Sequence, residues 1–113
     1  MRIEDCSFGK ITVDGKAYTA DVIIYPGRVD SSWRRREGHS LHLDDLLDVV
    51  NERPDSIIIG TGFYGALEVP QDLVRELVSR GTEVYVRKTR EAVSLFKDLS
   101  LQKRTIACLH LTC

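Results

Sequence analysis

The most constraining stretch of this chain is an apolar run that leads directly into a glycine-rich loop. Residues 57–59 are all isoleucine, which is typical of a buried strand, and residues 60–65 read Gly-Thr-Gly-Phe-Tyr-Gly. The loop has the G-x-G-x-x-G lettering of a dinucleotide-binding turn, in which a helix begins inside the loop and its N-terminus faces the pyrophosphate. Here the helical pattern begins only at Pro70. The stretch therefore predicts a strand and a tight loop without the helix on which the phosphate chemistry of the motif depends.

The residues that follow complete a strand–helix–strand unit. Apolar side chains recur at helical spacing from Leu73 to Val78, Gly81 ends this pattern, and residues 83–87 return to a β-prone run. A right-handed crossover of this kind makes the two strands parallel, so their carboxyl ends lie at one edge of a sheet. Ligands of open α/β sheets usually bind at that edge. We therefore expect the 60–65 loop to lie beside residues 87–90.

Hairpin, strand and helix signals flank this unit on both sides, and together they predict an α/β fold. The expected elements are two hairpin strands around Asp14-Gly15, strands at 22–25 and 105–111, a weaker strand at 29–33, a helix at 43–50, and a helix from Thr89 to Leu99. The direction of the last strand stays open.

Length and composition restrict the classes of protein. With 113 residues, of which 42% are hydrophobic, the chain has material for one core, so we expect a single domain over residues 1–113. A net charge of -1 gives no general attraction to nucleic acid, and no apolar run is long enough to cross a membrane. The N-terminus is charged where a signal peptide is apolar, and three cysteines form no disulfide framework. We therefore expect a cytoplasmic protein with reduced thiols.

Several short motifs are spread over nearly the whole chain. They are Phe8-Gly9, Asp14-Gly15, Trp33, Arg34 to His39, Asp45-Leu46, Ile59-Gly60-Thr61-Gly62, Thr89-Arg90-Glu91-Ala92 and His110-Leu111-Thr112-Cys113. Together they resemble the Mth-type domain family of an archaeal conserved hypothetical protein, whose relatives include an adipogenesis-associated protein and a mitochondrial complex I assembly factor.

The resemblance implies a three-layer α/β fold with a central mixed sheet of five strands, about three helices and a small additional β-hairpin element. It implies no established catalytic activity, and it implies assembly or regulation through protein partners. Many relatives have Tyr-Asn where this chain has Phe96-Lys97, so no role of that asparagine carries over.

Two segments at the expected strand ends are candidates for binding a small anion. Gly60-Thr61-Gly62 allows main-chain N–H groups to approach a ligand closely. Arg87-Lys88-Thr89 combines two positive charges with a threonine that is placed to cap the third helix, whose N-terminus carries partial positive charge. Among dinucleotides, these basic residues favour one with a 2′-phosphate. The structural alternative is a tight strand exit followed by a capped helix with solvated charges.

Residues 33–39 are a second candidate site. Trp33, Arg34, Arg35 and Arg36 are residue types that anchor protein interfaces, and Glu37 and His39 are candidates for general acid/base chemistry. The alternative is an Arg36–Glu37 or an Arg–Asp ion network, with His39 hydrogen-bonded to the backbone. An RNA-binding role has less support, because interleaved aromatic residues and an overall basic charge are missing.

Cys108, His110 and Cys113 have soft ligand atoms, but a tetrahedral zinc site usually draws on two separate knuckles, so buried thiols beside a hydrogen-bonded histidine are the stronger interpretation. A Cys–His catalytic pair has equally little support. No pattern indicates a metal or another cofactor. The leading hypothesis is a non-enzymatic binding or assembly module for a protein partner or a second copy, with a possible small-anion site. The alternative is a small enzyme or nucleotide binder that uses the 60–65 loop with His39 or Glu37.

Overall fold

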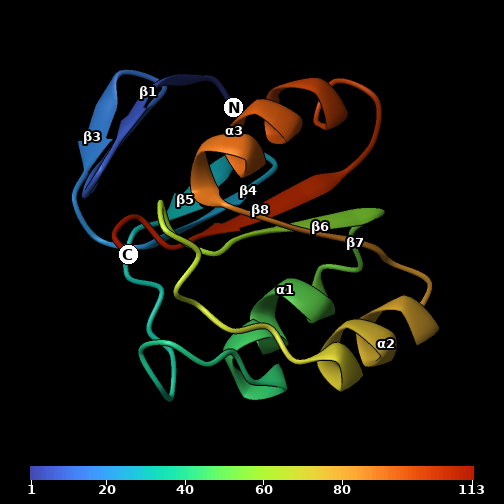
Figure 1. Ribbon diagram of the computed structural model, residues 1–113. Helices are drawn as coiled ribbons and strands as arrows, with labels where there is room; N and C mark the ends of the chain where they lie inside the picture. Colours follow the sequence, from blue (N-terminus) through green and yellow to red (C-terminus); the bar gives the residue numbers. More distant parts are fainter.

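The computed structural model describes all residues from 1 to 113 and has a three-layer α/β arrangement (Figure 1). The central layer is a five-stranded sheet with the order β5-β4-β8-β6-β7, and a second sheet has the order β1-β2-β3. The elements in chain order are β1 (Ile3–Ser7), β2 (Lys10–Val13), β3 (Lys16–Tyr18), β4 (Val22–Tyr25), β5 (Arg28–Asp30), η1 (Leu43–Leu46), α1 (Leu47–Asn51), β6 (Ser56–Gly60), α2 (Gln71–Ser79), β7 (Glu83–Arg87), α3 (Thr89–Leu99) and β8 (Thr105–Leu109).

The strand directions bring four chain segments to one edge of the central sheet. β6 pairs in parallel with both β7 and β8, as the crossover predicts for β7, so all three carboxyl ends lie together. β4 runs antiparallel to β8, with Val22 opposite Leu109, so its amino end lies at the same edge. We call this the carboxyl edge; it comprises residue 21 and residues 60–65, 87–90 and 110–113.

Apolar side chains fill the space on both faces of the central sheet. Ile57 and Ile59 of β6 pack toward η1, α1 and α2, where Leu77 belongs to the same cluster. Ile58 points to the other face and packs with Phe96 of α3 and with the three-stranded sheet. Figure 1 shows α3 and β1–β3 above the five strands and α1 and α2 below them. A strand that is buried on both faces explains the unbroken isoleucine run.

Some elements differ from the sequence-based expectation. The helix expected at 43–50 is divided into a 3-10 turn, η1, and the short α1, and β1 was not expected at all. Thr89 is the first residue of α3, whose N-cap is Lys88, so the expectation that Thr89 caps the helix was wrong. The Thr89 hydroxyl is held by other partners, described below. No helix combines the length and the apolar character that crossing a membrane requires.

Candidate functional site

The glycine loop at the carboxyl edge uses its main-chain N–H groups within the chain itself. Phe63 donates to the carbonyl oxygen of Thr112 at 2.8 Å. Tyr64 and Ala66 both donate to the main-chain oxygen of Cys113, at 2.9 and 3.1 Å. A phosphate-binding loop must leave such groups free for its ligand. Residues 112–113 therefore fill the space in which this loop would hold an anion.

Two glycines of the loop are explained by the same close packing. Gly62 has φ +101°, and a Cβ at this position would lie 2.2 Å from the carbonyl carbon of Cys113. A Cβ on Gly60 would lie 2.9 Å from Cδ2 of Leu109 and 3.0 Å from Oγ1 of Thr89. Only glycine permits these approaches, because any larger residue collides with neighbouring strands or with the main chain. The G-x-G spacing thus serves the packing of the chain against itself.

The two threonines of the candidate anion-binding segments, Thr61 and Thr89, also have partners inside the protein. Oγ1 of Thr89 accepts the Gly62 N–H at 2.8 Å and donates to the carbonyl oxygen of His110 at 2.6 Å. Thr89 is completely buried. The N–H and the hydroxyl of Thr61 both donate to the carbonyl oxygen of Arg87, at 2.9 and 3.2 Å. These hydroxyls join β6, β7, β8 and α3 at their carboxyl-edge ends.

Arg87 and Lys88 are exposed beside the loop. Arg87 donates from Nη1 to the carbonyl oxygen of Val86 at 2.9 Å, and its guanidinium lies 5.8 Å from the centre of the Tyr85 ring. Neither residue forms an ion pair within the chain. Their positive charges are therefore available at the surface of the carboxyl edge.

A buried hydrogen-bonded cluster lies at the same edge. Arg35 and His110 were candidates in the sequence, but nothing there indicated that Asp21 joins them. Oδ2 of Asp21 lies 2.8 Å from Nδ1 of His110 and accepts a hydrogen bond from Nη1 of Arg35 at 2.8 Å. Oδ1 accepts the Leu111 N–H at 2.7 Å. The side chains of His110 and Arg35 are each 7% exposed. The antiparallel pairing of β4 with β8 creates this cluster, because the residue before β4 then faces the residue after β8.

The environment of Asp21 keeps it ionised. Partial burial would raise the pKa of this carboxyl, but the hydrogen bonds from His110, the Leu111 N–H and Arg35 outweigh burial and lower the pKa to about 2. As a carboxylate, Asp21 accepts a hydrogen bond from Nδ1–H of His110. This arrangement ties the segment after β8 to the segment before β4.

The tryptophan and arginines of residues 33–36 divide between the interior and the surface. Trp33 is buried and donates from Nε1 to the carbonyl oxygen of Asp45 at 3.1 Å. The buried Arg35 lies over the Trp33 ring at 4.7 Å. Arg34 and Arg36 are exposed. Trp33 and Arg35 are thus removed from any partner that docks on the surface.

The two acid/base candidates of this segment have different neighbours. The carboxylate of Glu37 is hydrogen-bonded to Nε2 of His42, and both groups are partly exposed. His39 is exposed, and its ring centre lies 6.0 Å from that of His110. The structure therefore brings His39, but not Glu37, to the histidine at the carboxyl edge.

The cysteines do not converge on a common point with His110. Cys108 is buried in the core, and burial raises the pKa of its thiol, which makes it a poor nucleophile. Cys113 is exposed. No group of three or more histidine, cysteine, aspartate or glutamate side chains is placed to hold a metal ion.

An exposed aromatic cluster completes the carboxyl edge. Phe8, in the turn between β1 and β2, lies 5.9 Å from Phe63 and 6.0 Å from Tyr64 between ring centres. Phe8 is 54% exposed and Tyr64 is 76% exposed. The guanidinium of Arg90 lies 5.4 Å from the centre of the Phe63 ring. We call Phe8, Phe63, Tyr64 and Arg90 the aromatic patch; its members were visible in the sequence, but nothing there placed Phe8 beside the loop.

These features define an α/β protein whose glycine loop is structural and whose carboxyl edge presents aromatic and basic side chains. The chain belongs to the family described as "Protein of unknown function (DUF498/DUF598)", whose model matches residues 3–111. It is similar to the conserved hypothetical protein PH1505 from Pyrococcus horikoshii OT3, with 32% identity, complete coverage of both chains and a TM-score of 0.87.

Two further solved structures share this fold, and the first of them also supports the Mth-type assignment. The protein MT938 is 30% identical, with coverage of 98% of this chain and 97% of its own, and a TM-score of 0.78. A Mth938-like domain protein from Bordetella pertussis shares the fold at 17% identity, with coverage of 96% and 84% and a TM-score of 0.68. The resemblance to the Mth-type domain family is confirmed, and with it the α/β fold around a mixed five-stranded sheet.

Proposed function

We propose that this protein is a non-enzymatic binding module that docks a partner protein on the aromatic patch. The observation that carries the proposal is the combination of exposed rings with a fixed main chain. Phe63 and Tyr64 are held by hydrogen bonds to residues 112–113, and the Gly9 N–H beside Phe8 donates to the carbonyl oxygen of Leu111 at 2.7 Å. A surface that is already ordered loses little conformational entropy when a partner binds.

The residue types support a protein partner with acidic groups. Aromatic side chains and arginine are enriched among the residues that contribute most to interface affinity. Arg90 lies against the Phe63 ring, and Arg87 and Lys88 add two exposed positive charges in the same run, in which Glu91 is the one carboxylate. We therefore expect the partner to place apolar side chains on the rings and carboxylates around them.

The alternative of a small enzyme has less support. A catalytic histidine must reach the substrate, and His110 is enclosed with Asp21 and Arg35. The main-chain N–H groups of the loop already have acceptors, so they are not donors for a developing oxyanion. His39 is exposed, but no base or nucleophile lies within hydrogen-bonding distance of it in this structure.

The proposal is tested by affinity capture with tagged protein, followed by mass spectrometry. The wild type is compared with the double variant Phe8→Ser/Tyr64→Ser, which removes two exposed rings and leaves the core intact. Leu101→Ser is the matched control, because Leu101 is 86% exposed and lies before β8, at the other edge of the sheet. We expect one or a few proteins that the wild type and the control retain and the double variant loses.

Equal capture by all three proteins contradicts the proposal. Size-exclusion chromatography with light scattering on the same samples identifies a second copy as the partner, if the wild type and the control are dimers and the double variant is a monomer.

A further inference from the structure

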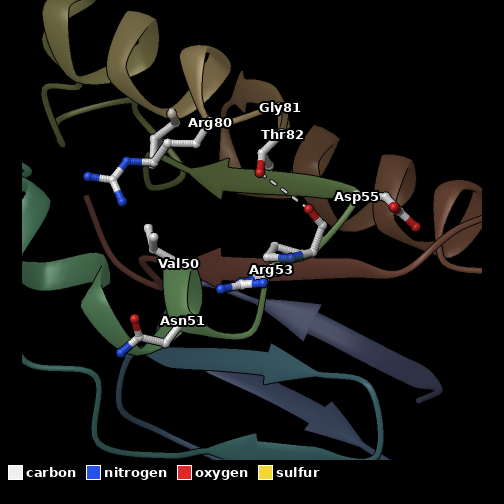
Figure 2. A pocket seen from close by; sticks show the side chains of 9 residues that line it. Val50, Asn51, Arg53, Asp55, Arg80, Gly81 and Thr82 are labelled. Atoms are coloured by element: carbon white, nitrogen blue, oxygen red, sulfur yellow. Dashed lines mark hydrogen bonds between the residues drawn. The ribbon is translucent and has the colours of Figure 1, made fainter.

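A cavity of about 570 Å³ lies at the opposite edge of the sheet, where β6 and β7 begin. It is lined by the end of α1 and the residues after it, and by the end of α2 and the turn into β7. Figure 2 shows it from close by, with Arg53, Arg80 and Asn51 around the same space. Its volume is in the range of small-molecule sites. The carboxyl edge, with the aromatic patch, lies at the far end of β6.

Two guanidinium groups supply positive charge to this cavity. Arg53 has no hydrogen bond or ion pair from its side chain within the protein. Nε of Arg80 donates to Oε2 of Glu76 at 2.9 Å, which leaves its two Nη groups without a partner. Planar guanidinium groups with free N–H donors are the usual recognition elements for phosphate.

The remaining lining favours an anion that carries an apolar group. The partly buried Val50 gives the cavity one apolar wall, and the buried Leu77 and Pro54 lie behind it. The carboxylate of Asp55 is directed elsewhere: it accepts the Arg104 N–H at 3.0 Å and points away from both arginines in Figure 2. Since Glu76 is paired with Arg80, the positive charge of the cavity that lacks an ion-pair partner is that of Arg53.

The backbone at Arg53 is unusual for this residue type. Arg53 follows α1 in the left-handed conformation, with φ +50°, a position in which glycine or asparagine is favoured. An arginine here costs roughly 1 kcal/mol more than glycine. The stability of the fold therefore does not explain why residue 53 is an arginine. A guanidinium at the rim of the cavity can bind an anion.

We propose that this cavity is a binding site for a small phosphate monoester with an apolar body. The phosphate lies between the guanidinium groups of Arg53 and Arg80, and the apolar body lies against Val50. A carboxylate has two oxygens, and one guanidinium group can donate hydrogen bonds to both of them. A phosphate monoester has three terminal oxygens, which can accept hydrogen bonds from both guanidinium groups. The site is independent of the aromatic patch.

The probe is phenyl phosphate, titrated into ¹⁵N-labelled protein at constant ionic strength while amide shifts are followed. We expect saturable shifts at Asn51, Arg53, Gly81 and Thr82. Inorganic phosphate and benzoate bind about tenfold more weakly, because one lacks the apolar body and the other the third oxygen. Benzoate that binds as tightly as phenyl phosphate contradicts the assignment of a phosphate.

Arg53→Gly separates binding from folding, because glycine adopts the left-handed conformation without strain. We expect this variant to be at least as stable as the wild type and to bind phenyl phosphate about tenfold or more weakly. Arg75→Gln removes an exposed arginine of α2 that does not line the cavity, and its affinity stays unchanged. The proposal is overturned if no saturable shifts occur, if Arg53→Gly binds like the wild type, or if Arg75→Gln loses as much affinity.

Discussion

The single residue Gly62 shows that the same glycine motif can have two different structural roles. In a nucleotide fold the glycine lets the backbone approach a pyrophosphate. In this protein the backbone approaches the main chain of Cys113, and the loop amides are satisfied there. The sequence predicts that another group packs closely against this glycine. It does not predict that this group is the main chain of residues 112–113.

The single residue Asp21 makes the stability of the protein depend on pH. Its pKa is lowered from 3.8 to about 2 in the folded state, so the stabilisation is complete above about pH 4 and is lost as the pH falls toward 2. Asp21→Asn removes the titrating group and leaves Arg35 without its carboxylate, which destabilises the protein at neutral pH. We expect the stability gap between wild type and variant to shrink by about 1 kcal/mol from about pH 5 to about pH 3.

Urea unfolding at the two pH values measures this gap. Asp98→Asn removes an exposed carboxylate without an ion pair and controls for the change in net charge. A gap between wild type and Asp21→Asn that is the same at both pH values is incompatible with the lowered pKa of Asp21.

The first residue of α3 is anchored to two neighbouring segments by a single hydroxyl, in addition to the apolar packing of the helix. Oγ1 of Thr89 bonds to Gly62, after β6, and to His110, after β8. Thr89→Val keeps the shape of the side chain but leaves one buried N–H and one buried carbonyl oxygen unpaired. We expect it to lower the free energy of unfolding by about 2 to 4 kcal/mol.

Thr89→Ser keeps the hydroxyl and is the matched control, with a loss of about 1 kcal/mol from the missing methyl group. Denaturant unfolding followed by circular dichroism compares the three proteins. If Thr89→Val is as stable as Thr89→Ser, the hydroxyl does not have the anchoring role assigned to it.

Elements with a strong local pattern could be predicted, and those that depend on distant contacts could not. The hairpin at Asp14-Gly15, the parallel pair β6 and β7, and the face of α2 all follow from spacing within a few residues. The apolar spacing of residues 43–50 did not indicate that this helix is divided into η1 and α1. The contact of Asp21 with His110 joins residues 89 positions apart, and it depends on a strand pairing that the sequence left open.

At the scale of the whole molecule, the two edges of one sheet carry different chemistry. The carboxyl edge is packed by the chain itself and leaves aromatic rings at the surface, while the edge where β6 and β7 begin has a cavity with two arginines. The general rule for α/β sheets predicts binding at the carboxyl edge. It did not predict the aromatic patch, because Phe8 reaches this edge only through the turn between β1 and β2.

The most direct test of partner docking on the aromatic patch is photo-crosslinking in cells with benzoylphenylalanine at single positions. Replacement of Tyr64 puts the photoreactive ring in the patch, and replacement of Leu101 puts it at an equally exposed site on the other edge. We predict a discrete adduct from position 64 that is absent from position 101 and is lost when Phe8→Ser is added. The same adducts from both positions, or none from position 64, would contradict docking on the aromatic patch.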